Sequence, residues 1–130
     1  MRGLYGVAVI ALAVAGGCGG EATSQEAADA VTADPQHYTV EFENDVIRVL
    51  RIRYGPGEAS VMHRHPANCA IFITQTTGTF QLPTGETVEA LGTPGQVQCG
   101  DAEVHLPTNT SASAFEVIVV ELKGREAFAQ

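Results

Sequence analysis

The feature that most constrains the fold is a series of short runs, beginning at His37, in which apolar and polar residues alternate. In the run 46–54, for example, Leu50, Ile52 and Tyr54 would all face the same side of an extended strand. No long stretch after His37 shows the apolar spacing of about 3.6 residues that is typical of an amphipathic helix. The runs predicted as strands are 38–42, 46–54, 60–65, 70–74, 79–82, 87–91, 97–99 and 115–122.

Turn-forming residues separate these runs, so the strands are expected to be short and to fold back on one another. Gly55-Pro56-Gly57 is a strong turn signal, and Pro83-Thr84-Gly85 predicts a hairpin between two strands. Many short strands at this spacing are typical of an antiparallel β-sandwich or β-barrel. A chain of 130 residues also suits one small domain. We therefore predict an all-β domain, a small antiparallel β-barrel, over residues 37–125.

The N-terminal residues have the features of an export signal. Arg2 precedes an apolar run, 4–15, which is shorter than the roughly 20 residues needed to span a bilayer. Ala15-Gly16-Gly17 then leads directly to Cys18, and this order resembles the lipobox of bacterial lipoproteins. The resemblance implies that residues 1–17 are removed and that Cys18 carries a lipid anchored in the membrane, with ordinary signal-peptide cleavage as the alternative. In either case we expect an exported protein, periplasmic or at the cell surface.

A tether is predicted between the signal and the barrel. Residues 18–36 are rich in Gly, Ala, Ser, Thr and acidic side chains and show no sustained apolar period, which is typical of a flexible segment. The predicted organisation is a signal peptide (1–17), a flexible tether (18–36), the barrel domain (37–125) and a C-terminal tail (126–130).

The charge of the chain argues against nucleic acid as a partner. The sequence has 15 acidic against 7 basic residues, a formal net charge of -8, and its basic residues are not clustered. Proteins that bind nucleic acids need a basic surface that displaces counterions from the phosphates. We therefore expect no nucleic-acid partner.

The histidines supply the strongest chemical signal. His63 and His65 are two residues apart, so on a strand both imidazoles project from the same face, with Cα atoms about 6.6 Å apart. Such a pair suits two ligands of one metal ion, because imidazole is the commonest protein metal ligand. His105 is expected, like this pair, near a turn at a strand end, whereas His37 is expected at the surface. An H-x-H pair alone is weak evidence, so its surroundings decide its meaning.

Two spaced motifs surround these histidines, and they resemble the motifs of the cupin superfamily. The family motifs run G-x5-H-x-H-x3,4-E-x6-G and G-x5-P-x-G-x1,2-H-x3-N. The matching residues here are Gly57, His63, His65, Gly95, His105 and Asn109. Asp101 and Glu103 stand where the second motif has Pro and Gly. The similarity covers residues 38–122 and implies the cupin fold, a double-stranded jelly-roll barrel.

The resemblance also implies a metal site. The family histidines map onto His63, His65 and His105, which would bind a divalent Fe, Mn, Ni, Zn or Cu ion as cofactor. Three histidines leave positions open for water and substrate. A metal-free cupin that keeps only the pocket is the alternative.

A fourth ligand does not carry over from the family. The position of the family's carboxylate falls at Cys69 or Ala70. Cys69 is the most direct substitute, because a thiolate is a strong ligand for soft or borderline metals. Glu103 is a weaker candidate. Cys69 could instead pair with Cys99 in a disulfide or remain a free core thiol.

Two functions follow from these predictions. In the first, the barrel is a metal-dependent enzyme, oxygenase-like or isomerase-like, that acts on a small molecule in the barrel mouth. In the second, it is a non-catalytic binding module at the cell surface, either without metal or with a disulfide between Cys69 and Cys99. The sequence assigns no catalytic residue and leaves both functions open. A homodimer formed through an exposed edge strand is a further prediction.

Overall fold

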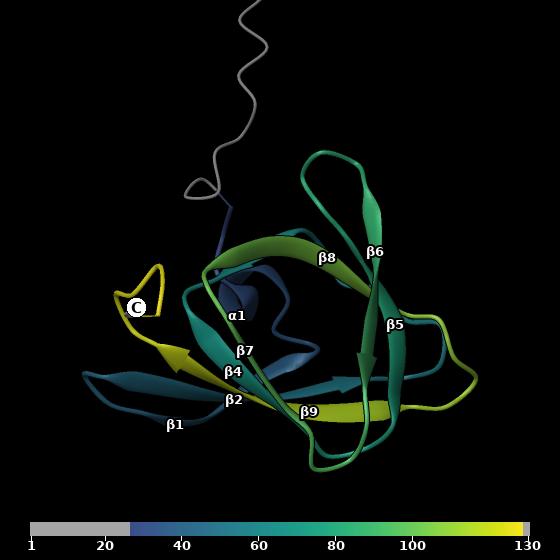
Figure 1. Cartoon of the computed structure of the whole chain (residues 1–130), viewed down its shortest axis with the longest axis horizontal. Coiled ribbons are helices and arrows are strands. Elements are labelled where there is room, and N and C mark those ends of the chain that lie inside the picture. The colour runs from purple at the N-terminus through teal and green to yellow at the C-terminus, as the bar shows by residue number, and fades with distance from the viewer. Residues whose placement is uncertain (1–26, 129–130) are drawn as a thin grey trace, which may run out of the picture.

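The computed structural model describes residues 27–128, and Figure 1 shows them as a small β-barrel with one short helix. The elements of this described part are α1 (Ala30–Ala33), β1 (Tyr38–Glu43), β2 (Ile47–Tyr54), β3 (His63–His65), β4 (Asn68–Phe72), β5 (Thr76–Gln81), β6 (Thr87–Gly92), β7 (Val97–Gly100), β8 (Glu103–Asn109) and β9 (Phe115–Leu122). The predicted signal peptide, Cys18 and the first part of the predicted tether lie outside the described residues. Within residues 27–128, none of the helical structure is of a length and hydropathy that could cross a membrane.

The strands form two antiparallel sheets that curve around one interior (Figure 1). The first sheet has the order β1-β2-β9-β4-β7, and the second has the order β3-β8-β5-β6. Strands far apart in the sequence are neighbours, since β2 pairs with β9 along its whole length and β3 pairs with β8. This topology confirms the predicted all-β antiparallel barrel.

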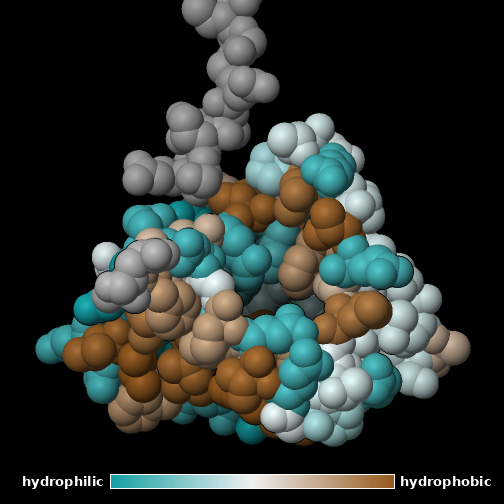
Figure 2. Space-filling model, viewed as in Figure 1, coloured by the Kyte–Doolittle hydropathy of each residue, from teal (hydrophilic) through white to brown (hydrophobic). Residues whose placement is uncertain are grey.

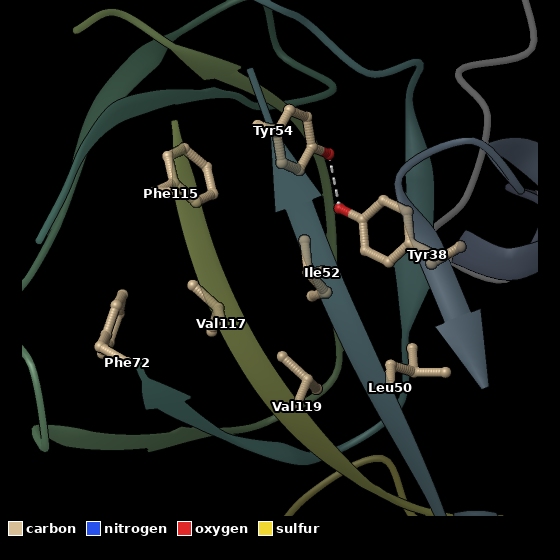
Figure 3. Packing of buried hydrophobic residues seen from close by; sticks show 9 residues of the cluster. Tyr38, Leu50, Ile52, Tyr54, Phe72, Phe115, Val117 and Val119 are labelled. Atoms are coloured by element: carbon tan, nitrogen blue, oxygen red, sulfur yellow. Dashed lines mark hydrogen bonds between the residues drawn. The ribbon is translucent and has the colours of Figure 1, made fainter. Parts of the chain in front are cut away.

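The apolar core lies on the inner face of the first sheet, mainly on β2 and β9 (Figure 3). Leu50, Ile52 and Tyr54 of β2 are all buried, as their alternation with polar residues predicts. Phe115 and Val117 begin the matching row on β9, where burial alternates along the strand. Burying a side chain of this kind stabilises the fold by roughly 1.5–3 kcal/mol. The paired rows therefore fix the register of β2 against β9.

The sequence predicts eight of the nine strands in the described residues and misses β8. Pro107 lies inside β8, and a proline without an N–H argues against the interior of a strand. In the structure β8 lies between two partners, since residues 103–105 pair with β3 and residues 106–109 pair with β5. His105, expected near a turn at a strand end, therefore lies within a strand.

Residues 27–36 are folded onto the barrel, so the prediction of a flexible tether is wrong for this stretch. The Asp29 carboxylate caps α1 by accepting hydrogen bonds from two amides of the helix. Ala30 is fully buried against the core. The backbone N–H of Arg64 on β3 donates to the carbonyl of Ala28 over 2.9 Å. These contacts outweigh the loop-like composition, and the folded unit begins before β1.

The folded unit also extends past its predicted C-terminal boundary. Glu126 belongs to the predicted tail, 126–130, but its carbonyl accepts a hydrogen bond from the backbone N–H of Ala102 over 2.6 Å. Its carboxylate forms an ion pair with Arg64 of β3. The described part of the tail is thus held on the barrel beside β3 and β8.

Candidate metal centre

Three buried histidines meet on β3 and β8. The antiparallel register of these strands places His63 opposite His105. His65 projects on the same side as His63, because side chains alternate along a strand. His63, His65 and His105 are 0, 3 and 4% exposed, respectively. One potential ligand atom from each lies within 4.8 Å of the others. The structure therefore brings together the three histidines that the sequence predicts as ligands.

Hydrogen bonds on the far side of two of the rings fix which nitrogen faces the cluster. His63 Nδ1 lies 2.8 Å from the carbonyl oxygen of Val61, and His65 Nδ1 lies 2.7 Å from Glu121 Oε1. An oxygen acceptor of this kind calls for a proton on Nδ1, which leaves a lone pair on Nε2. The two Nε2 atoms are 3.1 Å apart. Two lone pairs therefore face each other at short range.

This arrangement fits a divalent metal ion. Facing lone pairs repel each other unless they share a cation, either a proton or a metal ion. Two nitrogens bound to one ion at about 2.1 Å lie roughly 3 Å apart, which agrees with the 3.1 Å between the Nε2 atoms of His63 and His65. His105 Nδ1 is buried and has no hydrogen-bond partner among the described residues. Three imidazoles suit Fe, Mn, Ni, Zn or Cu and leave a position open for water or substrate.

Burial keeps two of the imidazoles in the form that binds metal. Burial, reinforced by His65 and His105, lowers the pKa of His63 to about 3. The pKa of His105 is also lowered, because burial outweighs the opposite effect of Glu103. Metal ions bind the neutral imidazole. Both rings are therefore ready to act as ligands at neutral pH.

A buried carboxylate that the sequence analysis missed holds the His65 ring in place. Glu121 is 1% exposed and lies in a row of β9 that is otherwise apolar. It also accepts a hydrogen bond from Arg48 Nε over 2.6 Å, and Arg48 Nη1 donates to Asp29 Oδ1 over 3.1 Å. Burial alone would raise the pKa of Glu121, but hydrogen bonds and charges from His65 and Arg48 lower it overall. An acidic residue in an apolar row was the signal that could have revealed it.

The predicted fourth ligand, Cys69, is bonded to Cys99 instead. The two cysteines lie opposite each other on β4 and β7 and form a disulfide. A disulfide sulfur offers no thiolate to a metal, so the prediction of Cys69 as a ligand is wrong. The disulfide alternative is the one that the structure contains. Ala70, the other position of the family's carboxylate, has no ligand atom in its side chain.

Glu103 provides a carboxylate beside the histidines. It stands opposite His65 in the register of β3 and β8, and its Oε2 lies 3.5 Å from His105 Nδ1. Burial raises its pKa, but the neighbouring side chains, first His105 and then His65 and Asn68, lower the pKa overall. Glu103 is therefore a carboxylate at neutral pH. Of the two residues considered as a fourth ligand, Cys69 and Glu103, only Glu103 has a free ligand atom beside the histidines.

A second polar cluster lies behind His63, and it contains the histidine that was expected at the surface. His37 is 6% exposed, with Nδ1 2.6 Å from Asp34 Oδ2 and Nε2 2.9 Å from Glu58 Oε2. The Ser60 hydroxyl donates to Asp34 over 2.6 Å and lies 3.3 Å from His63 Nδ1. The prediction for His37 is wrong, because two carboxylates satisfy its ring nitrogens in the interior. The cluster joins residues 34–37 to the three-histidine site.

Two of the three histidines, His65 and His105, border a cavity inside the barrel. Its volume is about 500 Å³, within the range of about 300–1,000 Å³ that is usual for small-molecule sites. His65, His105 and Glu103 line part of it. Much of the remaining wall is apolar, with Ile52, Phe72, Phe80, Leu91, Phe115 and Val117 among its residues. Figure 2 shows the molecule hollowed near the centre of one face, between apolar and polar side chains.

Comparison with solved structures agrees with the fold. A cupin domain from Bordetella pertussis Tohama I has a TM-score of 0.62 and 25% sequence identity, over 67% of this chain and 92% of that chain. A conserved protein with a double-stranded β-helix domain from Klebsiella pneumoniae has a TM-score of 0.52 and 19% identity, over 72% and 79% of the two chains. A cupin superfamily protein from Desulfitobacterium hafniense has a TM-score of 0.50 and 11% identity, over 65% and 74%. No protein-family model and no curated protein matches the chain.

The chain has the cupin fold, a double-stranded barrel. The double-stranded barrel confirms the resemblance that the two histidine motifs carry in the sequence. The three family histidines occupy one small buried cluster, which could hold a metal ion.

Proposed function

We propose that this chain is an exported, metal-dependent cupin enzyme that acts on a small molecule held in the barrel cavity. The observation that carries the proposal is the 3.1 Å approach of the Nε2 atoms of His63 and His65, beside His105 and the cavity. Such a cluster is costly in an empty core and favourable around a shared cation.

The residues of the site have separable roles in this proposal. His63, His65 and His105 would hold the ion, which when bound polarises an oxygen of the small molecule. Glu103 is a carboxylate on the same cavity wall, so it can accept a proton from a group next to that oxygen. The apolar wall limits competition from water. A proton transfer of the isomerase type is therefore the reaction that the wall supports best, and oxygen-dependent chemistry is the other reaction type to test.

The disulfide supports the proposed location outside the cytoplasm. Disulfides such as Cys69–Cys99 form and persist in oxidising compartments. Export through residues 1–17 and lipid anchoring at Cys18 complete this part of the proposal. A homodimer is also proposed, because β1 is an edge strand with Val40 and Phe42 exposed.

Metal binding is tested first. Protein purified without added metal or chelator is analysed for elements, and metal-free protein is titrated with Zn, Mn, Fe, Ni and Cu ions by calorimetry. We expect one ion per chain, lost when His63→Ala and His105→Ala are combined. His37→Asn is the control, because His37 is a buried histidine outside the cluster. Circular dichroism verifies that each variant is folded.

Two outcomes would overturn the metal site. The first is wild-type protein that binds none of these ions. The second is a folded double variant that still binds one ion per chain.

Catalysis is tested next with the metal-loaded protein. Oxygen consumption and a screen of neutral carbonyl and hydroxyl compounds would detect turnover, and Glu103→Gln should abolish proton transfer while one ion per chain is retained. If loaded wild-type protein turns over none of them, the enzyme proposal fails. The non-catalytic binding module, which the missing family carboxylate at Cys69 and Ala70 favours, then takes its place.

A further inference from the structure

The cavity wall carries negative charge and no positive side chain. Among residues 27–128, no lysine or arginine lines the cavity. Two carboxylates do line it, Glu103 on β8 and Glu89 on β6. A negatively charged ligand would therefore meet two like charges and no arginine or lysine.

Five of the six basic side chains among residues 27–128 are held elsewhere by carboxylates, and the sixth, Arg125, does not line the cavity. Arg48 is bound by Glu121 and Asp29 behind His65. Arg51 and Arg53 pair with Glu116, Arg64 pairs with Glu126, and Lys123 pairs with Glu43. None of these five cations borders the cavity. A swing of any of these five side chains into the cavity would have to break an ion pair, so none of them is a ready partner for an anion.

The rest of the wall suits a flat apolar ligand. Phe72, Phe80 and Phe115 all line the cavity. The ring of Phe80 lies 4.1 Å from the ring of His105, centroid to centroid. A phenyl group could therefore pack against aromatic rings while a polar atom reaches the histidines.

The lining of the cavity points to a ligand without net charge. An anionic ligand would lie near Glu89 and Glu103, with no lysine or arginine on the wall to pair with it. A cationic ligand would lie near the divalent ion that the three histidines would hold. A ligand without net charge meets neither repulsion.

We infer that the cavity selects an uncharged, largely apolar small molecule, aromatic by preference, with one oxygen near the three histidines, and that it rejects anions. This inference rests on the proposed function and names its substrate class. Carboxylates and phosphate esters are thereby excluded as substrates.

The test uses three probes of nearly equal shape: neutral benzamide, anionic benzoate and cationic benzamidine. Each is titrated into metal-free and Zn-loaded full-length protein at neutral pH, and binding is followed by NMR shifts of backbone amides. In metal-free protein we expect benzamide to bind more tightly than benzoate by on the order of tenfold or more, because like charges are costly at close range. In Zn-loaded protein we expect benzamidine to bind more weakly than benzamide, because the bound ion repels the cationic probe.

Variants assign the selectivity to the cavity wall. Combining Glu89→Gln with Glu103→Gln should raise benzoate affinity in metal-free protein and leave benzamide affinity nearly unchanged. Glu86→Gln is the matched control, because Glu86 lies on the exposed turn before β6 and does not line the cavity. It should change neither affinity.

The inference is overturned if metal-free wild-type protein binds benzoate as tightly as benzamide. It is also overturned if no probe shifts the amides of cavity residues, or if the double variant keeps the full preference. Because this comparison is made without metal, its failure is distinct from failure of the metal titration, which tests the proposed ligands alone.

Discussion

Replacing Glu121 with Gln tests whether the ion pairs behind His65, formed by Glu121, Arg48 and Asp29, stabilise the fold. Glu121 is 1% exposed and accepts hydrogen bonds from His65 Nδ1 over 2.7 Å and from Arg48 Nε over 2.6 Å. Gln has nearly the same shape but no charge and only one acceptor atom. Removing one partner of a buried ion pair costs about 3–5 kcal/mol. Because Arg48 is 18% exposed and keeps Asp29 as a second partner, we expect the lower end, about 3 kcal/mol.

The same substitution should weaken metal binding. If the Gln oxygen accepts from Arg48, its NH₂ group faces His65 Nδ1 and favours the tautomer with the proton on Nε2. That proton would occupy the atom that faces the three-histidine cluster. Loss of such a supporting partner typically lowers metal affinity by about 10–100-fold.

Two measurements check the Glu121 prediction. Thermal unfolding at pH 7 should show a midpoint lower by roughly 12–24 °C, the shift that 3 kcal/mol produces in a domain of about 100 residues. Calorimetric titration with Zn should show the weaker binding. Glu116→Gln is the control on the same strand, because Glu116 pairs with Arg51 and Arg53 on the outer face. A Glu121→Gln protein that melts and binds Zn like the wild type would refute the reasoning.

Three further predictions concern other parts of the molecule. Metal-free protein should lose stability as the pH falls from 6.5 towards 3. His63 has a pKa of about 3 in the folded protein and 6.5 when exposed, so the unfolded chain takes up the proton first. Urea denaturation at several pH values measures this loss, and rising stability in that window would contradict it. Replacing Cys69 and Cys99 by Ser should cost about 3–4 kcal/mol, since the disulfide closes a loop with a separation of 30 residues. Elemental analysis of this variant should still find one ion per chain, and loss of the ion would contradict a site made of the three histidines alone. Gly92→Ala should lower the free energy of unfolding by about 1–3 kcal/mol, because the added methyl group would overlap the ring of Phe72. Urea denaturation measures this change, and a variant as stable as the wild type would show that the ring can move aside.

Local alternation accounts for the parts of the fold that the sequence predicts well. Leu50, Ile52 and Tyr54 share a buried face because successive side chains of a strand point to opposite sides, whatever the neighbouring strands are. The same rule puts His63 and His65 on one side of β3. It fails for β8, where Pro107 breaks the local pattern and the pairing with β3 and β5 forms the strand nevertheless.

Long-range contacts account for what the sequence analysis missed or misplaced. His37 looks like a surface residue until Asp34 and Glu58 are brought to its two ring nitrogens. Cys69 could be a ligand, a free thiol or half of a disulfide until β7 places Cys99 opposite it. In each case the partner, and not the residue, decides the chemistry.

By itself, the sequence determined that the chain forms short antiparallel strands, and that two histidines share a face, because these properties depend on residues next to one another. The cupin motifs added His105 as the third member by resemblance. Only the tertiary structure decided that Glu121 supports His65, that Cys69 is withdrawn from the site, and that the cavity wall has no lysine or arginine among the described residues. These outcomes depend on which strands pair and in what register, and pairing is fixed by the burial of the whole core, which no local run of residues encodes.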